Sequence, residues 1–211
     1  MSQSHSTSRY CQHCGKAKKA CICQWIQPVD TDVELIILQH PTEVNRSKGT
    51  EKILTLSLKN SRCLVGENFT QHVELNQLLK DKNYRYLLLY PKEGAQPLER
   101  ILKEQAFEAD HRPWRVILLD GTWKKAFKMY QLSVNLHAIP AVTLPESLQG
   151  NYRIRKAPGE NHLSTAEAGY YLLSALDKSG DFTPLIDAFE RMIDFQIAQL
   201  PEGVYQSNYL D

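Results

Sequence analysis

Residues 115–123 read Arg-Val-Ile-Leu-Leu-Asp-Gly-Thr-Trp, and this stretch decides the fold. The run Val116–Leu119 is short and lacks the polar alternation of a strand with one solvated face, so it predicts a strand covered on both faces. Gly121 then marks a turn, and residues 122–132 predict a helix. A buried strand that passes directly into a helix is the unit of an α/β fold with a largely parallel sheet.

The rest of the chain repeats this alternation, with flanking helices between apolar strands. We expect strands at Val33–Leu38, Arg62–Val65, Tyr84–Tyr90, Arg115–Leu119 and Ala138–Leu144. We expect helices at Lys48–Lys59, Glu74–Asp81, Pro97–Ala109, Thr122–Leu132, Ser164–Lys178 and Thr183–Leu200. The fifth of these helices opens with Ser-Thr-Ala-Glu, a capping box in which the Ser164 and Glu167 side chains bond each other's backbone.

Length and composition are those of an ordinary globular protein. The chain has 211 residues, 42% hydrophobic and 23% charged, which excludes collagen-like, coiled-coil and fully disordered proteins. No apolar run approaches the ~20 residues that cross a bilayer. The polar start of the chain lacks the apolar core of a signal peptide, so we expect a cytoplasmic protein. We expect a zinc-binding head at 1–29 and an α/β catalytic domain at 30–211.

Charge is distributed unevenly, although its sum is only +1. Residues 1–29 carry four basic and no acidic side chains, whereas the chain from Asp181 onward carries six acidic and one basic. A basic head indicates a polyanion near the N-terminal end, and two solvated surfaces without a partner are the alternative. We expect the acidic C-terminal helix to face away from that polyanion.

Four of the five cysteines lie close together, at Cys11, Cys14, Cys21 and Cys23. Two such pairs of thiolates reach the corners of a tetrahedral zinc ion, with Zn–S bonds of ~2.3 Å. Because four sulfurs leave no position for water, the predicted zinc is structural. Disulfides and free thiols are the alternatives; the first need an oxidising compartment, and the second oxidise readily when clustered.

Three other residues bear on this interpretation. His13 lies between the first two cysteines and is a competing zinc ligand. Gly15 follows that pair, where a turn around metal-bound sulfur favours a positive φ. The fifth cysteine, Cys63, is predicted to be a buried strand thiol.

Ligands of parallel sheets bind beyond the carboxyl ends of the strands, so the residues after each strand are candidates. Asp120 ends the apolar strand quoted above, and it is either the N-cap of the next helix or a catalytic carboxylate. Trp123 either packs in the core or stacks on a nucleobase. The chain has no GxGxxG, GxxxxGK[ST] or GxSxG motif, which argues against dinucleotide, P-loop and α/β-hydrolase sites.

Five short motifs occur in one order on this chain. They are Cys-x-x-Cys…Cys-x-Cys at 11–23, His-Pro-Thr-Glu at 40–43, Leu-Tyr-Pro at 89–91, Asp-Gly-Thr-Trp at 120–123 and Ser-Thr-Ala-Glu-Ala at 164–168. The set closely resembles the DTW-domain family of tRNA-uridine aminocarboxypropyltransferases, over about residues 11–176. The chain departs from the family pattern at 45–50, where it reads Asn-Arg-Ser-Lys-Gly-Thr and family members often have a Pro and an Asn-Thr pair.

The resemblance implies a fold related to the SPOUT class, with a deep trefoil knot near the cofactor. It implies S-adenosylmethionine as donor of a 3-amino-3-carboxypropyl group, N3 of a tRNA uridine as acceptor, and 5′-methylthioadenosine as product. Members with this cysteine head resemble the bacterial type that modifies the variable-loop uridine at tRNA position 47.

These considerations together assign the candidate residues. The catalytic candidates are Asp120, as the base for N3, with Thr122 and Trp123. The cofactor-binding candidates are Tyr90, Pro91, Leu119, Gly121, Leu144, Ser164, Thr165 and Glu167. The RNA-binding candidates are Lys16, Lys18, Lys19, His40, Glu43, Arg46, Lys124, Lys125, Arg153, Arg155 and Lys156. Simple solvation is the alternative for each lysine.

Two other functions are compatible with the same residues. One is an RNA methyltransferase of the SPOUT type, which differs in the group transferred. The other is a non-catalytic, zinc-stabilised RNA-binding adaptor, which needs no donor site; the carboxylate at the strand end disfavours it.

Overall fold

The computed structural model describes residues 8–105, 110–148, 150–153, 163–201 and 204–205. Within these residues six strands form one sheet, and all neighbouring strands are parallel, in the order β2-β1-β5-β3-β6-β4. The strands are β1 (Glu34–Gln39), β2 (Ser61–Val65), β3 (Arg85–Leu89), β4 (Gln96–Pro97), β5 (Trp114–Asp120) and β6 (Ala141–Thr143). The predicted α/β fold with a parallel sheet is therefore confirmed.

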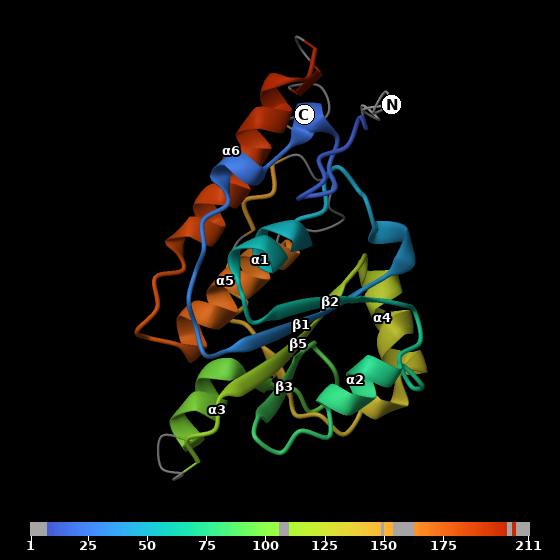
Figure 1. Ribbon diagram of the computed structural model, residues 1–211. Helices are drawn as coiled ribbons and strands as arrows, with labels where there is room; N and C mark the ends of the chain where they lie inside the picture. The colour runs from blue at the N-terminus through green and yellow to red at the C-terminus, as the bar shows by residue number, and fades with distance from the viewer. Residues whose placement is uncertain (1–7, 106–109, 149, 154–162, 202–203, 206–211) are drawn as a thin grey trace, which may run out of the picture.

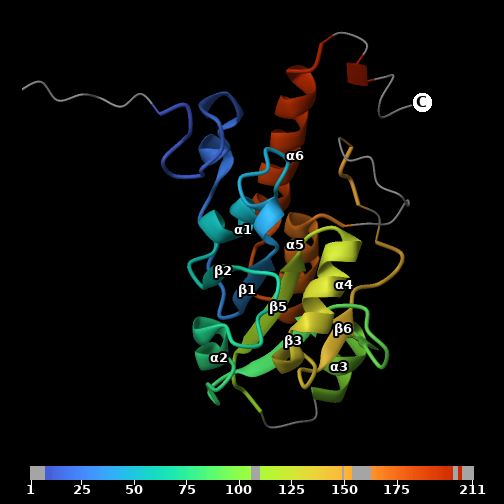
Figure 2. The same ribbon diagram turned by 90° about the vertical axis from the view of Figure 1, so that its right-hand side faces the viewer.

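Helices cover both faces of the sheet (Figures 1 and 2). They are α1 (Glu51–Ser57), α2 (Val73–Leu78), α3 (Leu98–Gln105), α4 (Trp123–Leu132), α5 (Thr165–Leu176) and α6 (Thr183–Ala198), with 3-10 turns η1 (Lys18–Ala20), η2 (Cys23–Trp25), η3 (Pro41–Glu43) and η4 (Val134–Leu136). One core lies between the sheet and α1, α3, α5 and α6, and a second between the sheet and α2 and α4. Leu35 and Ile37 of β1 point into the first core, and Ile36 and Leu38 into the second. This double burial is why β1 and β5 read as unbroken apolar runs.

Several predicted elements begin later than their sequence pattern indicates. The helix predicted from Lys48 begins at Glu51, and the strand predicted from Ala138 begins at Ala141, directly after Pro140, which has no N–H to give to a neighbouring strand. The two-residue strand β4 is absent from the prediction because two residues carry no periodic pattern. Cys63 lies on β2 as predicted, but it is only half-buried.

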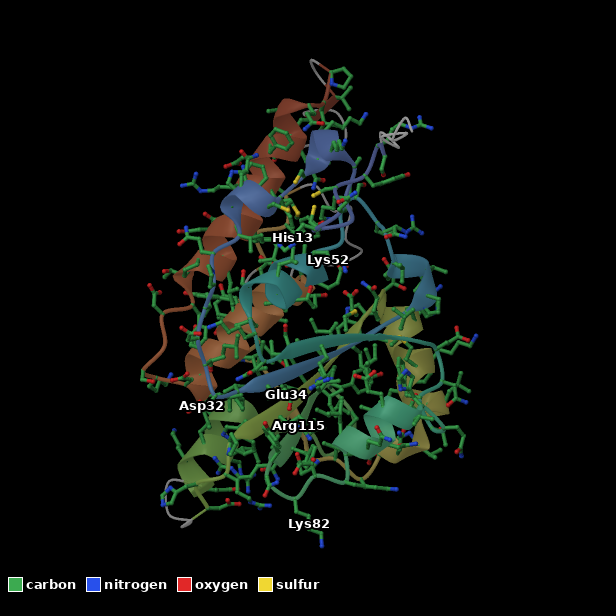
Figure 3. The ribbon with its side chains drawn as sticks, in the orientation of Figure 1. His13, Asp32, Glu34, Lys52, Lys82 and Arg115 are labelled. Atoms are coloured by element: carbon green, nitrogen blue, oxygen red, sulfur yellow. The ribbon has the colours of Figure 1, made fainter. Side chains whose placement is uncertain are left out.

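The amino ends of the central strands carry a buried ion pair. Arg115 Nε donates to Glu34 Oε2 at 2.5 Å, and both side chains are at most 7% exposed. Figure 3 shows the two residues side by side on β5 and β1. Arg115 and Glu34 therefore neutralise each other near the amino end of β5, at the opposite end of the strand from Asp120.

The cysteine head packs against the body of the protein rather than standing apart from it. Cys14 and Ile22 are fully buried in the same core as β1. The Trp25 ring meets Phe195 of α6 edge-on at 5.3 Å, and Gln199 Nε2 donates to the Lys19 carbonyl. Helix α6, part of the acidic C-terminal segment, therefore packs beside the basic head, because its apolar side needs a partner. That its acidic side faces away from a bound polyanion stays a prediction. Among the described helices, none has the length and apolar composition required to cross a membrane.

Candidate functional site

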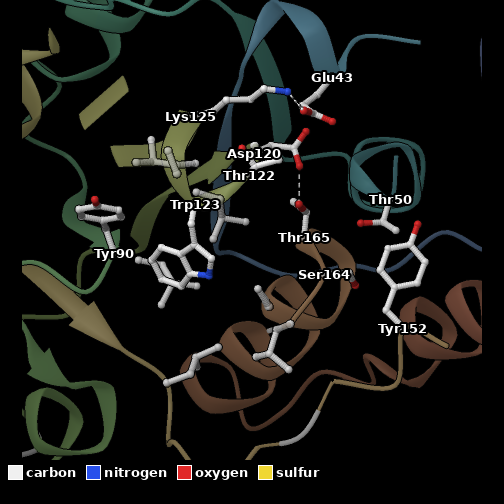
Figure 4. A pocket seen from close by; sticks show the side chains of 18 of the residues that line it. Glu43, Thr50, Tyr90, Asp120, Thr122, Trp123, Lys125, Tyr152, Ser164 and Thr165 are labelled. Atoms are coloured by element: carbon white, nitrogen blue, oxygen red, sulfur yellow. Dashed lines mark hydrogen bonds and ion pairs between the residues drawn. The ribbon is translucent and has the colours of Figure 1, made fainter. Parts of the chain in front are cut away.

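A cavity of about 1040 Å³ opens beyond the carboxyl ends of β3, β5 and β6. The amino ends of α4 and α5 and the loop at 46–50 complete its wall (Figure 4). A ligand site in this position is the usual consequence of a parallel sheet, because every strand delivers its carboxyl end to the same edge. The sequence motifs at 89–91, 120–123 and 164–165 all meet here.

Asp120 is the last residue of β5, and its buried carboxylate lines the cavity. Its Oδ2 accepts a hydrogen bond from Gln39 Nε2 at 2.9 Å, and its Oδ1 accepts one from Thr165 Oγ1 (Figure 4). Gln39 is its register partner on β1, and Thr165 is the first residue of α5. The N-cap residue of α4 is Thr122, so the capping alternative for Asp120 is wrong. Neighbours from two elements thus orient this carboxylate at the cavity.

Seven of the eight cofactor candidates line the cavity: Tyr90, Pro91, Leu119, Gly121, Leu144, Ser164 and Thr165. They come from the ends of three strands and from the start of α5. The eighth, Glu167, does not line it. Its Oε2 accepts from the Ser164 N–H at 2.7 Å, which completes the predicted capping box, and its Oε1 accepts from the Asn151 N–H. Glu167 therefore supports the cavity wall through its bonds to Ser164 and Asn151, without lining the cavity itself.

Trp123 begins α4 at the mouth of the cavity. Its side chain is 50% exposed and lines the opening, so it does not pack in the core. One helical turn further along, Phe127 is 58% exposed. Lys124 is exposed beside them. Phe127 was not predicted from the sequence, because an aromatic residue at helical spacing is usually part of a core.

Lys16 does not offer its charge to an RNA, contrary to the sequence prediction. It is 7% exposed, and its Nζ donates to the carbonyls of Arg46, Ser47 and Gly49, at 3.4, 2.9 and 2.7 Å. Burial lowers the pKa of this ammonium group. The residue therefore ties the head to the cavity loop.

Four of the RNA candidates at or near η3 are engaged within the protein. His40 caps η3, and its Nε2 lies 3.0 Å from Glu67 Oε1. Glu43 and Lys125 form an ion pair at 2.5 Å on the cavity wall (Figure 4). Arg46 also lines the cavity, and its Nε donates to the Thr42 carbonyl.

The remaining basic candidates lie on the surface or outside the described residues. Lys18, Lys19 and Lys124 are exposed. Arg153 is exposed and forms an ion pair with Asp194 of α6. Arg155 and Lys156 lie outside the described residues.

The four clustered cysteines converge on one point. Their sulfur atoms all lie within 4.8 Å of one another, with Cys11–Cys23 at 3.7 Å and Cys14–Cys21 at 3.8 Å. Four sulfurs bound to one tetrahedral zinc are separated by about 3.8 Å, so the arrangement fits this ion. All five cysteines lie within the described residues, and none of them forms a disulfide in this structure. Gly15 has the predicted positive φ, at 71°.

The ionisation of the cysteine thiols also favours a cation at the centre of this cluster. Backbone hydrogen bonds at Cys14 and His13 lower the pKa of Cys11 to about 6, whereas burial raises the pKa of Cys23. Four thiols this close cannot all ionise without a positive charge between them. His13 itself is exposed and is not part of the cluster.

Two polar residues behind Asp120 were not singled out from the sequence. Glu51 opens α1 and is 3% exposed, and its Oε2 has no hydrogen-bond partner. Burial, followed by the negative charge of Asp120, raises the pKa of Glu51. Gln39 lies between the two carboxyl groups, bonded to Asp120. A glutamate at the start of a helix ordinarily faces solvent, so only the tertiary structure reveals this buried group.

The chain is similar in sequence to one known family and to several curated proteins. The family model described as DTW domain matches residues 8–197. The protein named tRNA-uridine aminocarboxypropyltransferase 2 is 33% identical in Drosophila melanogaster and 30% in Mus musculus, over 79% and 89% of this chain. The chain spans 66% and 63% of the length of these relatives. In Arabidopsis thaliana, tRNA-uridine aminocarboxypropyltransferase A is 28% identical over 91% of this chain and 82% of its own length.

No solved structure matches the chain at a significant level. The family model alone covers nine-tenths of the sequence, including the cysteine head, the cavity motifs and most of α6. The chain therefore belongs to the DTW domain family.

Proposed function

We propose that this protein is a transferase that moves the 3-amino-3-carboxypropyl group of S-adenosylmethionine to N3 of a uridine in tRNA. The variable-loop uridine at position 47 is the proposed target, and 5′-methylthioadenosine is the second product. The observation that carries the proposal is Asp120, a buried carboxylate oriented into a large cavity at the strand ends. The names of the relatives support the same reaction.

The cavity suits a donor that is part apolar, part charged. Tyr90, Leu119 and Leu144 offer apolar surface to an adenine ring, and the strand-end backbone offers hydrogen bonds. The negative charge of Asp120 favours a cationic sulfonium nearby. The amino end of α5 also lines the cavity, and the positive end of its helix dipole favours the donor's carboxylate.

The reaction needs a base, because uracil N3–H is too weakly acidic to ionise at neutral pH. Asp120 accepts the N3 proton as the N3–carbon bond forms. The bond between that carbon and sulfur breaks, and its electron pair stays on sulfur. Charge is thereby balanced: the sulfonium becomes a neutral thioether, and the proton resides on the carboxylate.

The group that moves is decided by position. Sulfur carries a methyl group, the ribose C5′ and the γ-methylene, and only the carbon that faces N3 in line reacts. A methyltransferase is the alternative at the same site, and it would place the methyl group toward N3.

The mouth of the cavity suits an unstacked RNA base. Trp123 and Phe127 expose two rings on one face of α4, and Lys124 and Lys128 are exposed on the same helix. Aromatic rings beside basic side chains are the usual surface for single-stranded nucleotides. The exposed lysines of the head, Lys18 and Lys19, supply further phosphate contacts in this proposal.

Replacing Phe127 with alanine is expected to weaken tRNA binding about tenfold, the effect of one lost stacking contact. Because Phe127 is not part of the cavity wall, donor affinity should stay unchanged. Val134→Ala is the matched control: Val134 is 57% exposed and lies beyond the other end of α4. The measurement is tRNA affinity by filter binding and donor affinity by calorimetry. Unchanged tRNA affinity in Phe127→Ala would remove this face from the RNA site.

Mass analysis of modified tRNA tests the function itself. The protein is incubated with S-adenosylmethionine and unmodified tRNA, and the digested nucleosides are weighed. We expect an aminocarboxypropyl-uridine together with 5′-methylthioadenosine. A methylated uridine with S-adenosylhomocysteine would instead establish the methyltransferase. Binding of tRNA without any donor binding would establish the adaptor.

We further propose that the cysteine head holds a structural zinc, a proposal supported by the sulfur distances. The division at residues 29 and 30, cytoplasmic location and the knot implied by the resemblance stay predictions. Residues 154–162 stand in the sequence between the cavity-lining residues Tyr152 and Leu163, and they lie outside the described residues.

A further inference from the structure

Lys16 belongs to the cysteine head by its backbone. The Cys11 N–H donates to the Lys16 carbonyl at 2.8 Å, and the Gly15 N–H donates to the Cys11 carbonyl at 2.9 Å. These bonds close the turn at Gly15, whose positive φ directs the chain back toward the body. The direction in which the Lys16 side chain leaves the head therefore depends on the turn that the cysteines form.

The Lys16 side chain binds the cavity loop at residues 46–49. An ammonium group has three N–H donors, and Lys16 directs them at three carbonyls of the loop 46–49. A buried ammonium is costly unless its donors are satisfied, so this set of bonds fixes the loop and the side chain together.

The loop held in this way is part of the cavity wall. Arg46, Ser47, Lys48 and Gly49 all line the cavity, and Thr50 and Glu51 follow directly. The Tyr152 hydroxyl donates to the Lys48 carbonyl, and Gln196 Nε2 donates to the Ser47 carbonyl at 3.4 Å. Lys16 makes three hydrogen bonds to this loop, and it comes from the head.

The electric charges around Lys16 favour the same arrangement. Glu51 favours the charged form of this ammonium, and its effect is larger than the opposing effect of Lys52. A zinc ion bound by four thiolates would carry a net negative charge next to this ammonium. A folded head therefore helps to stabilise the buried charge that fastens the loop.

We propose that Lys16 is a positioning residue that couples the cysteine head to the donor cavity. The head is then part of the donor site and not only an RNA-binding attachment. Loss of the head's structure releases the loop 46–49 and weakens donor binding. The identity of the donor rests on the proposed function above, but the link between head and loop does not.

Lys16→Met tests the coupling, because methionine keeps the length and apolar stem of lysine without its donors. We expect at least a tenfold weaker affinity for S-adenosylmethionine, a raised KM for the donor and a nearly unchanged kcat at saturation. Zinc content should stay at one per chain. Lys59→Met is the matched control, since Lys59 is a solvent-exposed lysine outside the cavity wall and should bind the donor as the unmodified protein does.

A second measurement needs no donor. Hydrogen exchange of residues 46–50 should accelerate in Lys16→Met, while exchange in β1 and β5 stays slow. The same acceleration should follow when a chelator removes zinc from the unmodified protein, and chelation of Lys16→Met should add little to it. Slow exchange in both cases would overturn the proposal, even if the variant's stability falls.

The two proposals fail in different ways. If the unmodified protein binds no S-adenosylmethionine, the proposed function is wrong, and the exchange rates alone decide the coupling. If Lys16→Met binds the donor as tightly as the unmodified protein and keeps its loop protected, the coupling is wrong and the proposed function stands.

Discussion

Replacing Asp120 with asparagine is expected to lower kcat of the transfer by about 100- to 10,000-fold, the usual contribution of a general base. Asparagine has nearly the same shape and retains one oxygen for the Thr165 hydroxyl, but it cannot take up a proton. The measurement is single-turnover formation of the modified uridine with saturating donor and tRNA. The melting temperature should fall only modestly, since asparagine keeps the shape of the side chain and loses one of the two hydrogen bonds that Asp120 accepts from Thr165 and Gln39.

A matched control separates this effect from a general loss of negative charge. Glu146 also lines the cavity and is exposed, so Glu146→Gln makes the same chemical change without touching the oriented carboxylate. We expect turnover close to that of the unmodified protein. Full turnover in Asp120→Asn would refute the role of Asp120 as base, and equal losses in both variants would point to charge alone.

Replacing Cys14 with serine is expected to abolish stoichiometric zinc binding and to destabilise the head by several kcal/mol. Structural zinc supplies most of the folding energy of small metal-binding modules, and serine is a far weaker ligand than thiolate. Cys14 is also 1% exposed in the main core, so loss of the head exposes apolar surface beneath it. Zinc content by atomic absorption and the melting temperature are the two measurements.

Cys63→Ser is the control for this variant. Cys63 lies on β2, outside the sulfur cluster, and serine can replace its weak bond to Gln39. It should keep one zinc and a near-normal melting temperature. His13→Ala should also keep its zinc, since His13 is not among the clustered ligands. Native protein without zinc, or a Cys14→Ser variant that keeps it, would contradict the assignment.

Sequence patterns predicted correctly those features that depend on residues close together in the chain. The Ser164–Glu167 capping box and the positive φ of Gly15 depend on residues within one turn, and both are observed. The unbroken apolar runs of β1 and β5 predicted their burial on both faces. The strand-end motifs predicted a common site, because a parallel sheet gathers its carboxyl ends at one edge.

Long side chains were predicted less well. Lys16 and Lys18 are two residues apart and look alike in the sequence, yet one ammonium is buried under the cavity loop and the other faces solvent. Glu51 and Glu167 likewise look like helix-start residues, but only Glu167 makes the local bond that its position predicts. A long charged side chain adopts the direction in which its donors or acceptors find partners. Those partners are distant in the chain, so the sequence around the residue does not indicate them.

The sequence alone therefore predicted the α/β alternation, the double burial of the central strands, the clustering of the four cysteines and the meeting of the motifs at one edge of the sheet. The orientation of Asp120 by Gln39 and Thr165, the exposure of Trp123 at the cavity mouth and the bonds of Lys16 to the cavity loop became visible only in the tertiary structure. The first set follows from backbone periodicity and short spacing. The second depends on contacts between residues far apart in the chain, 81 positions in the case of Gln39 and Asp120, and no local pattern encodes such contacts.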